Sequence, residues 1–317
     1  MQPMQTDDLL ARLGALIRAQ AHGLGFLPSP MPGVVLMHMD RDLPQAPTVY
    51  EPCIVIVAQG HKIATFNGRR YTYDARHCLT ITLPLPFETE TFGSQEAPFL
   101  GLAVAVTPAL VTDLMLQMDH TPPSAAIDDP ISSVPMDAEL LSTAIRLVET
   151  MQSVERSRVL GPAIVRELVY LLLSAPGGGG LRSLAVGDNR LGRIAKVIHR
   201  LQNHYAAEHD MAALARDAGM SLTTFHAGFR ATTGESPLQY LKTIRLHRAR
   251  ELMVNEGLSA QATAMRVGYE SASQFSREFK RLFGDSPGAV AMRLRTLLNQ
   301  TRESQLRATL SFGRPST

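Results

Sequence analysis

Two stretches in the last third of the chain decide the fold: ALARDAGMSLTTFHAGFRATTGESP at residues 213–237 and ATAMRVGYESASQFSREFKRLFGDSP at residues 262–287. They are degenerate copies of one pattern, offset by 49 residues up to a glycine and by 50 residues beyond it. The first copy supplies Ala215, Gly219, Phe225, Phe229, Gly234, Ser236 and Pro237, which recur as Ala264, Gly268, Phe275, Phe279, Gly284, Ser286 and Pro287. Such a repeat indicates one supersecondary unit used twice.

Each copy predicts a helix, a tight turn and a second helix, over about 211–233 and 259–283. In the first copy Asp210 is a candidate N-cap, Gly219 stands where the chain needs a left-handed residue, and Ser221 can cap the second helix. The second copy has the equivalent residues Ser259, Gly268 and Ser271. Because the two phenylalanines of each second helix are four residues apart, they share an inward face. This is the helix-turn-helix pattern, whose second helix enters the DNA major groove.

The segment Pro237–Asn255 between the copies predicts a long helix with its apolar side chains on one arc. About 18 residues at 1.5 Å each span roughly 27 Å. A helix of that length can hold two recognition helices about one DNA turn apart, near 34 Å.

The charge of the chain is divided between its two parts. Residues 1–189 hold 12 Lys and Arg against 19 Asp and Glu, a net charge of −7. Residues 190–317 hold 19 against 10, a net charge of +9. This asymmetry predicts a basic module that binds a polyanion, joined to an acidic module that does not.

The first part predicts a short helix over residues 7–20 and then a small antiparallel barrel or sandwich. The expected strands are Cys53–Val57, His61–Phe66, Arg70–Tyr73, Cys78–Leu83 and Leu100–Val106, with a hairpin turn at Asn67-Gly68. Two amphipathic helices follow, over about 137–154 and 158–173. They either cover the barrel or form a dimer seam, and both roles can hold together.

The run of four glycines after Pro176 predicts a flexible linker. The net charge of the chain changes sign just beyond this run, which places the domain boundary there. The expected organisation is a front domain over 1–176, a linker over 177–190, a DNA-binding domain over 191–300 and a tail over 301–317.

Several function classes are excluded by composition. No apolar run reaches the ~18–20 residues that span a bilayer, and the acidic start of the chain lacks the basic region of a secretory signal. Two cysteines, Cys53 and Cys78, make no disulfide framework, so a reducing cytoplasm is expected. His61 and His77 lack the partners of a metal site, and no catalytic triad or phosphate-binding loop stands out. No cofactor or metal is therefore expected.

The segment around VGYESASQFSREFKRLFGDSP, together with ALARDAGMSLTTFHAGFRATTGESP, resembles the AraC/XylS transcriptional regulators. The front part resembles the AraC-type N-terminal effector domain. The resemblance implies a multidomain α+β protein, with a cupin-like antiparallel barrel and trailing helices before an all-α double helix-turn-helix domain. It implies a cytoplasmic, nucleoid-associated dimer that works with duplex DNA, RNA polymerase and a small-molecule effector, and that is not an enzyme.

In that family, base contacts come from the exposed face of each second helix. Carried onto this chain, the base-contacting residues are Thr223, His226, Ser273, Gln274, Ser276 and Arg277, and the phosphate contacts are Arg230, Lys280 and Arg281. Arginine can bind guanine O6 and N7 together, and glutamine can bind adenine N6 and N7. The first copy departs from the family pattern, because Ala227 and Gly228 stand where long polar side chains are common.

Some interpretations stay open from the sequence. Gln274 can be a capping-box partner of Ser271 rather than a base reader, and His226 can be a surface histidine. Arg245, Arg248 and Arg250 either support the long helix or meet phosphates, and Tyr71, Tyr73 and Arg76 either line an effector pocket or follow ordinary strand alternation. The competing functions are a cupin-type enzyme tethered to nucleic acid and a non-specific architectural DNA binder.

Overall fold

A computed structural model describes residues 6–118, 130–182, 184 and 190–296. The chain divides into two compact units, and the second consists of Ala46–Val49 together with the chain from Lys196 onward, which is inside helix α6 (Arg190–Asn203). The predicted tail over 301–317 lies outside the described residues.

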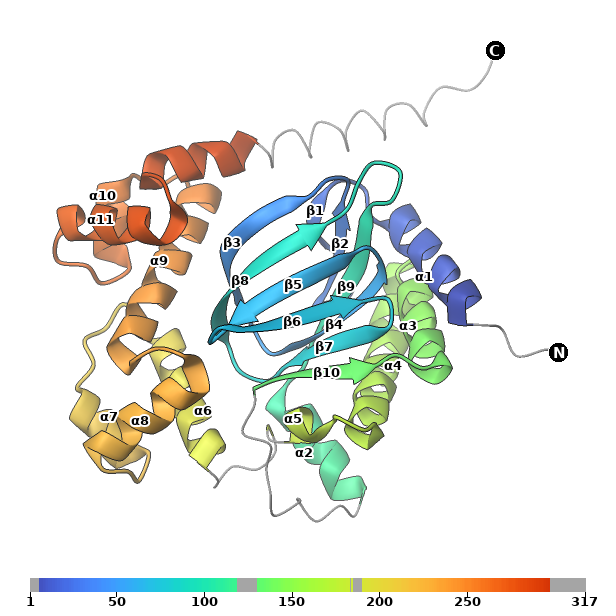
Figure 1. Ribbon diagram of the computed structural model, residues 1–317, viewed down its shortest axis with the longest axis horizontal. Helices are drawn as coiled ribbons and strands as arrows, with labels where there is room; N and C mark the ends of the chain where they lie inside the picture. Colours follow the sequence, from blue (N-terminus) through green and yellow to red (C-terminus); the bar gives the residue numbers. More distant parts are fainter. Residues whose placement is uncertain (1–5, 119–129, 183, 185–189, 297–317) are drawn as a thin grey trace. The chain divides into compact units, whose positions relative to one another are not determined.

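The front unit is built on a curled sheet of ten strands (Figure 1). The strands are β1 (Gly25–Pro28), β2 (Val34–Met39), β3 (Leu43–Tyr50), β4 (Cys53–Gln59), β5 (His61–Phe66), β6 (Arg69–Asp74), β7 (His77–Ile81), β8 (Leu85–Phe92), β9 (Phe99–Ala105) and β10 (Ile131–Pro135). Their order is β1-β2-β9-β4-β7-β6-β5-β8-β3, with β10 paired antiparallel to β7. The five strands expected from sequence are all present, which confirms the curled antiparallel fold.

The β5–β6 hairpin has the turn that its sequence requires. Asn67 and Gly68 both have positive φ, at 49° and 74°. This is the geometry of a two-residue turn whose twist matches that of the flanking strands. The hairpin places Lys62 directly opposite Tyr73.

Helices cover one face of the sheet (Figure 1). They are α1 (Thr6–Gln20), α2 (Pro108–Gln117), α3 (Ala138–Thr150), α4 (Val154–Ser174) and the short α5 (Gly179–Arg182). Ile54 and Ile56 of β4 belong to the core shared with these helices, and Val55 and Val57, which alternate with them, are buried on the opposite face. The two predicted amphipathic helices, α3 and α4, therefore cover the sheet.

Half of the strands were not expected from sequence: β1, β2, β3, β8 and β10. Strand β3 contains Pro44 and Pro47 and stands at the end of the sheet order, which is where a strand tolerates proline. From sequence alone its two prolines indicate a loop, because the strand pairing that makes β3 an edge strand is not visible there.

The predicted linker needs correction over its first residues. Gly179–Arg182 forms α5, Leu181 is fully buried in the front core, and the Arg182 Nε donates to the Leu173 carbonyl oxygen at 3.0 Å. A glycine run is permissive rather than obligatorily flexible, and here a buried leucine anchors it. Residues 183 and 185–189, which complete the predicted linker with Leu184 and Arg190, lie outside the described residues.

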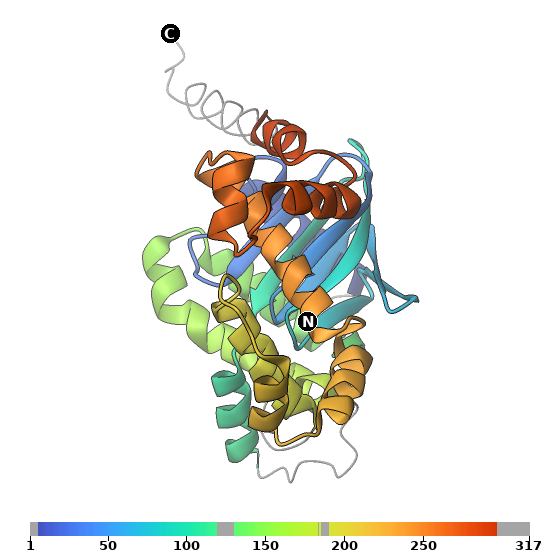
Figure 2. The ribbon, with the colours of Figure 1, turned by 90° about the vertical axis from the view of Figure 1, so that its left-hand side faces the viewer.

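The second unit is helical (Figure 2). After α6 come α7 (Met211–Asp217), α8 (Leu222–Thr233), α9 (Pro237–Asn255), α10 (Ala260–Arg266) and α11 (Ala272–Phe283), and residues 287–296 are also helical. Both views place α7 and α8 at one end of α9, with α10 and α11 at the other. Among the described residues, no helix is both long enough and apolar enough to cross a membrane.

Candidate nucleic-acid interface

The first helix-turn-helix unit is held in shape by its capping residues. The Asp210 carboxylate accepts from the backbone N–H of Ala212 at 2.9 Å, which fixes the start of α7. Gly219 turns the chain with φ 64°, a conformation that glycine adopts without strain. The Ser221 hydroxyl then accepts from the Thr224 N–H at 3.2 Å and caps α8.

The second helix-turn-helix, made by α10 and α11, repeats this arrangement of caps and turn. Ser259 caps α10, Gly268 turns the chain with φ 86°, and Ser271 caps α11. Helices α8 and α11 both have 12 residues, and each ends on a left-handed glycine, Gly234 at φ 81° and Gly284 at φ 80°. The sequence repeat is therefore a structural repeat, with both units and the helix between them at the predicted bounds.

Aromatic side chains fix each second helix from inside. Phe225 and Phe229 are fully buried, with ring centroids 5.7 Å apart, and Phe229 packs edge-on against Tyr240 of α9. Phe275 and Phe279 are also fully buried, with centroids 5.6 Å apart. With one side of each helix fixed in a core, the opposite side is left to the solvent.

The outward side of each helix carries most of the residues predicted to contact DNA. At 100° per residue, Thr223, His226 and Arg230 fall within an arc of about 60°, as do their equivalents Ser273, Ser276 and Lys280. Thr223, Ala227, Arg230, Ser273, Arg277, Lys280 and Arg281 are exposed, and His226, Gln274 and Ser276 are half-buried. Arg277 lies about 40° outside the α11 arc, opposite the midpoint between Phe275 and Phe279, and Arg281 and Gln274 lie about 80° and 100° from Ser273 in the same direction.

Gln274 is held by a carboxylate rather than by a capping box. Ser271 accepts from the Gln274 backbone N–H at 3.2 Å, which is half of the box, but the Gln274 side chain donates to Glu278 Oε1 at 3.1 Å. Its second amide hydrogen and its carbonyl oxygen remain for another partner. The Gln274 side chain is thus oriented by a residue one turn further along the same helix.

Glu278 is the centre of a small network that joins three elements. Lys242 of α9 and the Tyr269 hydroxyl each donate to it at 2.8 Å. Burial by itself raises the pKa of Glu278, but the hydrogen bonds from Lys242, Gln274 and Tyr269 hold it below its usual value. The network attaches α11 to the long helix, and sequence reasoning missed it because no local pattern brings Lys242 and Glu278 together.

Three half-buried arginines of α9 have partners within the protein. Arg245 donates to the carbonyl oxygens of Tyr205 and Ala207 at 2.7 and 2.9 Å, and Arg250 lies 4.7 Å from the ring centroid of Phe283. Both therefore support the helix packing. Arg248 pairs with Glu251 on the same helix at 2.9 Å.

Two histidines of the front unit, His38 and His61, have ordinary partners. His61 stacks on Phe92 with ring centroids 4.4 Å apart, and His38 Nδ1 lies 2.9 Å from the Gly23 carbonyl oxygen. Within the described ranges, no group of three or more His, Cys, Asp or Glu residues could hold a metal ion. Tyr73 is fully buried, whereas Tyr71 is half-buried and Arg76 is exposed.

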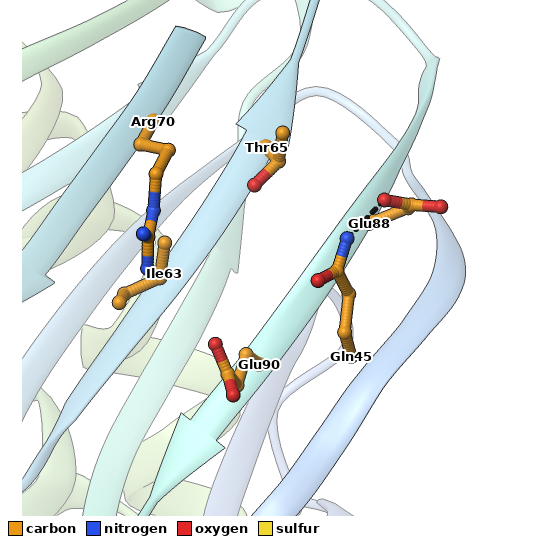
Figure 3. A pocket seen from close by; sticks show the side chains of 6 residues that line it. All are labelled: Gln45, Ile63, Thr65, Arg70, Glu88 and Glu90. Atoms are coloured by element: carbon orange, nitrogen blue, oxygen red, sulfur yellow. Dashed lines mark hydrogen bonds between the residues drawn. The ribbon is translucent and has the colours of Figure 1, made fainter. Parts of the chain in front are cut away.

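A polar pocket of about 310 Å³ lies on the strands β3, β5, β6 and β8 (Figure 3). Its lining residues are Gln45, Ile63, Thr65, Arg70, Glu88 and Glu90. The side chain of Gln45 donates to Glu88 across β3 and β8. Ile63 and Thr65 alternate along β5 with Lys62 and Ala64, so the pocket and these two buried residues lie on opposite faces of the strand.

Comparison with known proteins gives the family. Residues 30–180 match the model of the AraC-type transcriptional regulator N-terminus, and residues 214–293 match a helix-turn-helix domain. The transcriptional activator RhaS of Escherichia coli is 28% identical over 84% of this chain and 94% of its own length. RhaS of Yersinia pestis is 26% identical over 74% and 84%.

A solved structure shares the fold of both units. ToxT of Vibrio cholerae, as the apo K231A variant, superimposes with a TM-score of 0.58 at 12% identity, over 84% of this chain and 99% of that one. In this chain a repeated helix-turn-helix frame follows an antiparallel, helix-covered sheet, and ToxT superimposes over most of both. The chain belongs to the AraC family of DNA-binding transcriptional regulators, with an AraC-type N-terminal effector domain.

Proposed function

We propose that α8 and α11 enter two successive major grooves of one DNA duplex and so direct this regulator to particular operators. The observation that carries the proposal is the equivalence of the two helices, with the same length, the same caps and the same buried phenylalanine pair. Helix α9 has 19 residues and spans about 28 Å, which is close to the ~34 Å between successive grooves on one side of a duplex.

Base recognition is assigned chiefly to α11. Arg277 can donate two hydrogen bonds to a guanine, and Gln274, already oriented by Glu278, can donate to adenine N7 and accept from N6. Ser273 and Ser276 lie next to them on α11 and are assigned further base contacts. On α8 the base contacts are Thr223 and His226, which offer a methyl group for thymine and an imidazole nitrogen.

Phosphate contacts are assigned to Arg230, Lys280 and Arg281, all exposed on the recognition helices. Contacts between basic side chains and the DNA phosphates position the protein without reading the base sequence. These three side chains should therefore raise the affinity for every duplex. Since α8 has Ala227 where α11 has Arg277, the second unit contributes more of the specificity.

The test compares two arginine variants on a selected site and on variants of that site. Arg277→Ala should lose about 1–3 kcal/mol at one base pair and relax the preference there. Arg230→Ala should weaken binding to all sequences alike and lower the salt slope by about one. Arg266→Ala, at an exposed arginine of α10 that pairs with Glu256 at 3.4 Å, is the matched control and should change neither. Equal losses on every sequence for Arg277→Ala would remove its base-reading role.

The front unit is assigned a small-molecule effector, and its binding alters how two DNA-binding units of a homodimer are presented to the operator and to RNA polymerase. The family match supports this assignment, and one solved structure of ToxT is described as bound to an unsaturated fatty acid. The protein would act in the cytoplasm, at the nucleoid, without a catalytic step. An inducer response that survives deletion of residues 1–176 would contradict the effector role, and turnover of a ligand would favour the enzyme alternative.

A further inference from the structure

Lys62 is a buried cation without an anionic partner. Its side chain is 1% exposed, in the middle of β5. Its ammonium donates one hydrogen bond, to the Tyr50 hydroxyl at 2.9 Å. An ammonium has three N–H donors, and no ion pair joins Lys62 to a carboxylate in the described part of the chain. A buried charge is expensive unless it is paired, so an unpaired one points to a partner that is bound from outside.

Aromatic rings surround this ammonium. Its nitrogen lies 5.0, 5.7 and 5.8 Å from the ring centroids of Phe26, Tyr50 and Phe99. Phe99 precedes Leu100, which belongs to the core under the helices, so Phe99 points to the other, inner face of the curled sheet. The ammonium therefore lies inside the curl, where the walls near it are apolar.

A second unused donor lies beside it. The strand register places Tyr73 and Thr91 directly opposite Lys62 on its two sides. The Tyr73 hydroxyl is fully buried next to Tyr50, and within the described part of the chain it makes no hydrogen bond of good geometry. Burial, and then the neighbouring Tyr50, raise the pKa of Tyr73, so its hydroxyl keeps its proton and remains a donor.

Of the three rings around Lys62, that of Phe26 is the most exposed to solvent. This residue belongs to the four-residue strand β1 at the end of the sheet order and is 51% exposed. Gly23 and Gly25 beside it have φ of 140° and 104°. The chain that carries the outermost ring over Lys62 is therefore short, at a sheet edge, and flanked by glycines.

We propose that Lys62 and Tyr73 bind the carboxylate of a small organic acid whose apolar body lies against Phe26 and Phe99. The carboxylate would accept the free N–H groups of Lys62 and the Tyr73 O–H, and would supply the negative charge that the buried ammonium lacks. The proposal rests on the effector role assigned above and specifies the chemistry of that effector.

The experiment measures binding of straight-chain carboxylates, from acetate to oleate, to the full chain by isothermal titration calorimetry. Each acid is compared with the alcohol of equal length, for example octanoate with octanol. We expect at least one acid to bind tenfold or more tightly than its alcohol. A charge-assisted hydrogen bond contributes about 1.5–3 kcal/mol, so Lys62→Met should weaken the acid about ten- to hundredfold and leave the alcohol unchanged.

Arg70→Met is the matched control, because Arg70 is the exposed cation of the polar pocket on the opposite face of the sheet (Figure 3). It should bind the acid as the unaltered chain does. Tyr73→Phe should lose part of the affinity. Thermal unfolding without ligand gives a second reading: Lys62→Met should keep or raise the melting temperature, since it removes an unpaired buried charge.

Three results would overturn the proposal. The first is that no acid in the series binds better than its alcohol. The second is that Lys62→Met keeps the affinity of the unaltered chain for the acid. The third is that Arg70→Met, rather than Lys62→Met, loses this affinity. A markedly lower melting temperature for Lys62→Met, with no acid preference in the unaltered chain, would assign Lys62 a purely structural role. DNA binding is measured separately on the same preparations, so failure of operator recognition is distinguished from failure of acid binding.

Discussion

Replacing Gly268 with alanine should damage the second helix-turn-helix unit much more than the same change at Gly284. Both glycines are left-handed, at φ 86° and 80°, so the backbone penalty is the same. Alanine in that region costs about 1–2 kcal/mol, partly offset by the lower entropy of the unfolded chain, which leaves about 1 kcal/mol at Gly284. A Cβ at Gly284 would meet nothing within 4 Å.

At Gly268 the added Cβ collides with a neighbouring backbone. It would overlap the carbonyl oxygen of Ala206 and lie 3.0 Å from the carbonyl carbon. That carbonyl cannot move freely, because Arg245 of α9 holds the carbonyl oxygens on either side of it, those of Tyr205 and Ala207. Overpacking of this kind adds about 1–3 kcal/mol, so the total loss at Gly268 is expected to be about 2–4 kcal/mol.

The assay is urea unfolding of the two variants followed by circular dichroism, with operator affinity measured on the same samples. Gly268→Ala should unfold at lower urea and lose affinity, and Gly284→Ala should lose little of either. Equal destabilisation by the two variants would refute the close approach of the turn at Gly268 to residues 205–207. It would also refute the rigid spacing of the two helix-turn-helix copies.

Three further predictions concern single residues. Burial, with help from Arg250, lowers the pKa of His247 to about 3, so the unfolded chain binds the extra proton first and stability should fall on acidification from about pH 6.5 towards pH 3. His247→Leu should remove up to about 1.4 kcal/mol per pH unit of that slope, seen as the difference between the two pH–stability curves. Leu181→Ala should cost about 2–4 kcal/mol in thermal unfolding, because Leu181 is fully buried; a loss below about 0.5 kcal/mol would mean that residues 179–182 are a free linker after all. Glu278→Leu removes the acceptor, so it should release Gln274 and relax the preference for adenine at its base pair in a binding-site selection, and an unchanged preference would show that Glu278 does not orient Gln274.

The frame of the DNA-binding unit could be predicted from sequence because its determinants are local. Ser221 and Ser271 cap helices that begin one residue later, and Gly234 and Gly284 end them in a conformation that glycine adopts readily. The same holds for the Asn67-Gly68 hairpin. Each signal involves residues that are neighbours in the chain, so it can be recognised without knowledge of the tertiary contacts.

What could not be predicted depends on contacts between distant segments. Lys62 reads as a solvated charge in a strand until the curl of the sheet places it among Phe26, Tyr50 and Phe99. Its alternation with Ala64 and Phe66 was the available signal, because all three share one face of β5. The Glu278 network had no signal, since Lys242 is 36 residues away in sequence.

Which side chains meet the bases remains a prediction, because the positions of Arg277, Gln274 and their neighbours are fixed by the helix but their partners are nucleotides. The exposed side chain of Arg277 on α11 supports the assignment. Because α8 has Ala227 at the equivalent position, we expect weaker base reading by the first helix-turn-helix. Site selection with variants of both helices measures that difference.

The two recognition helices, α8 and α11, are proposed to lie in successive major grooves of one duplex. Purine methylation interference at N7, on a site selected with the full chain, measures this most directly because N7 lies in the major groove. We expect two clusters of interfering purines for each bound chain, about 10 base pairs apart, and Arg277→Ala should lose interference selectively at one guanine of the α11 cluster. A single cluster for each chain, or interference confined to minor-groove positions, would contradict the proposal.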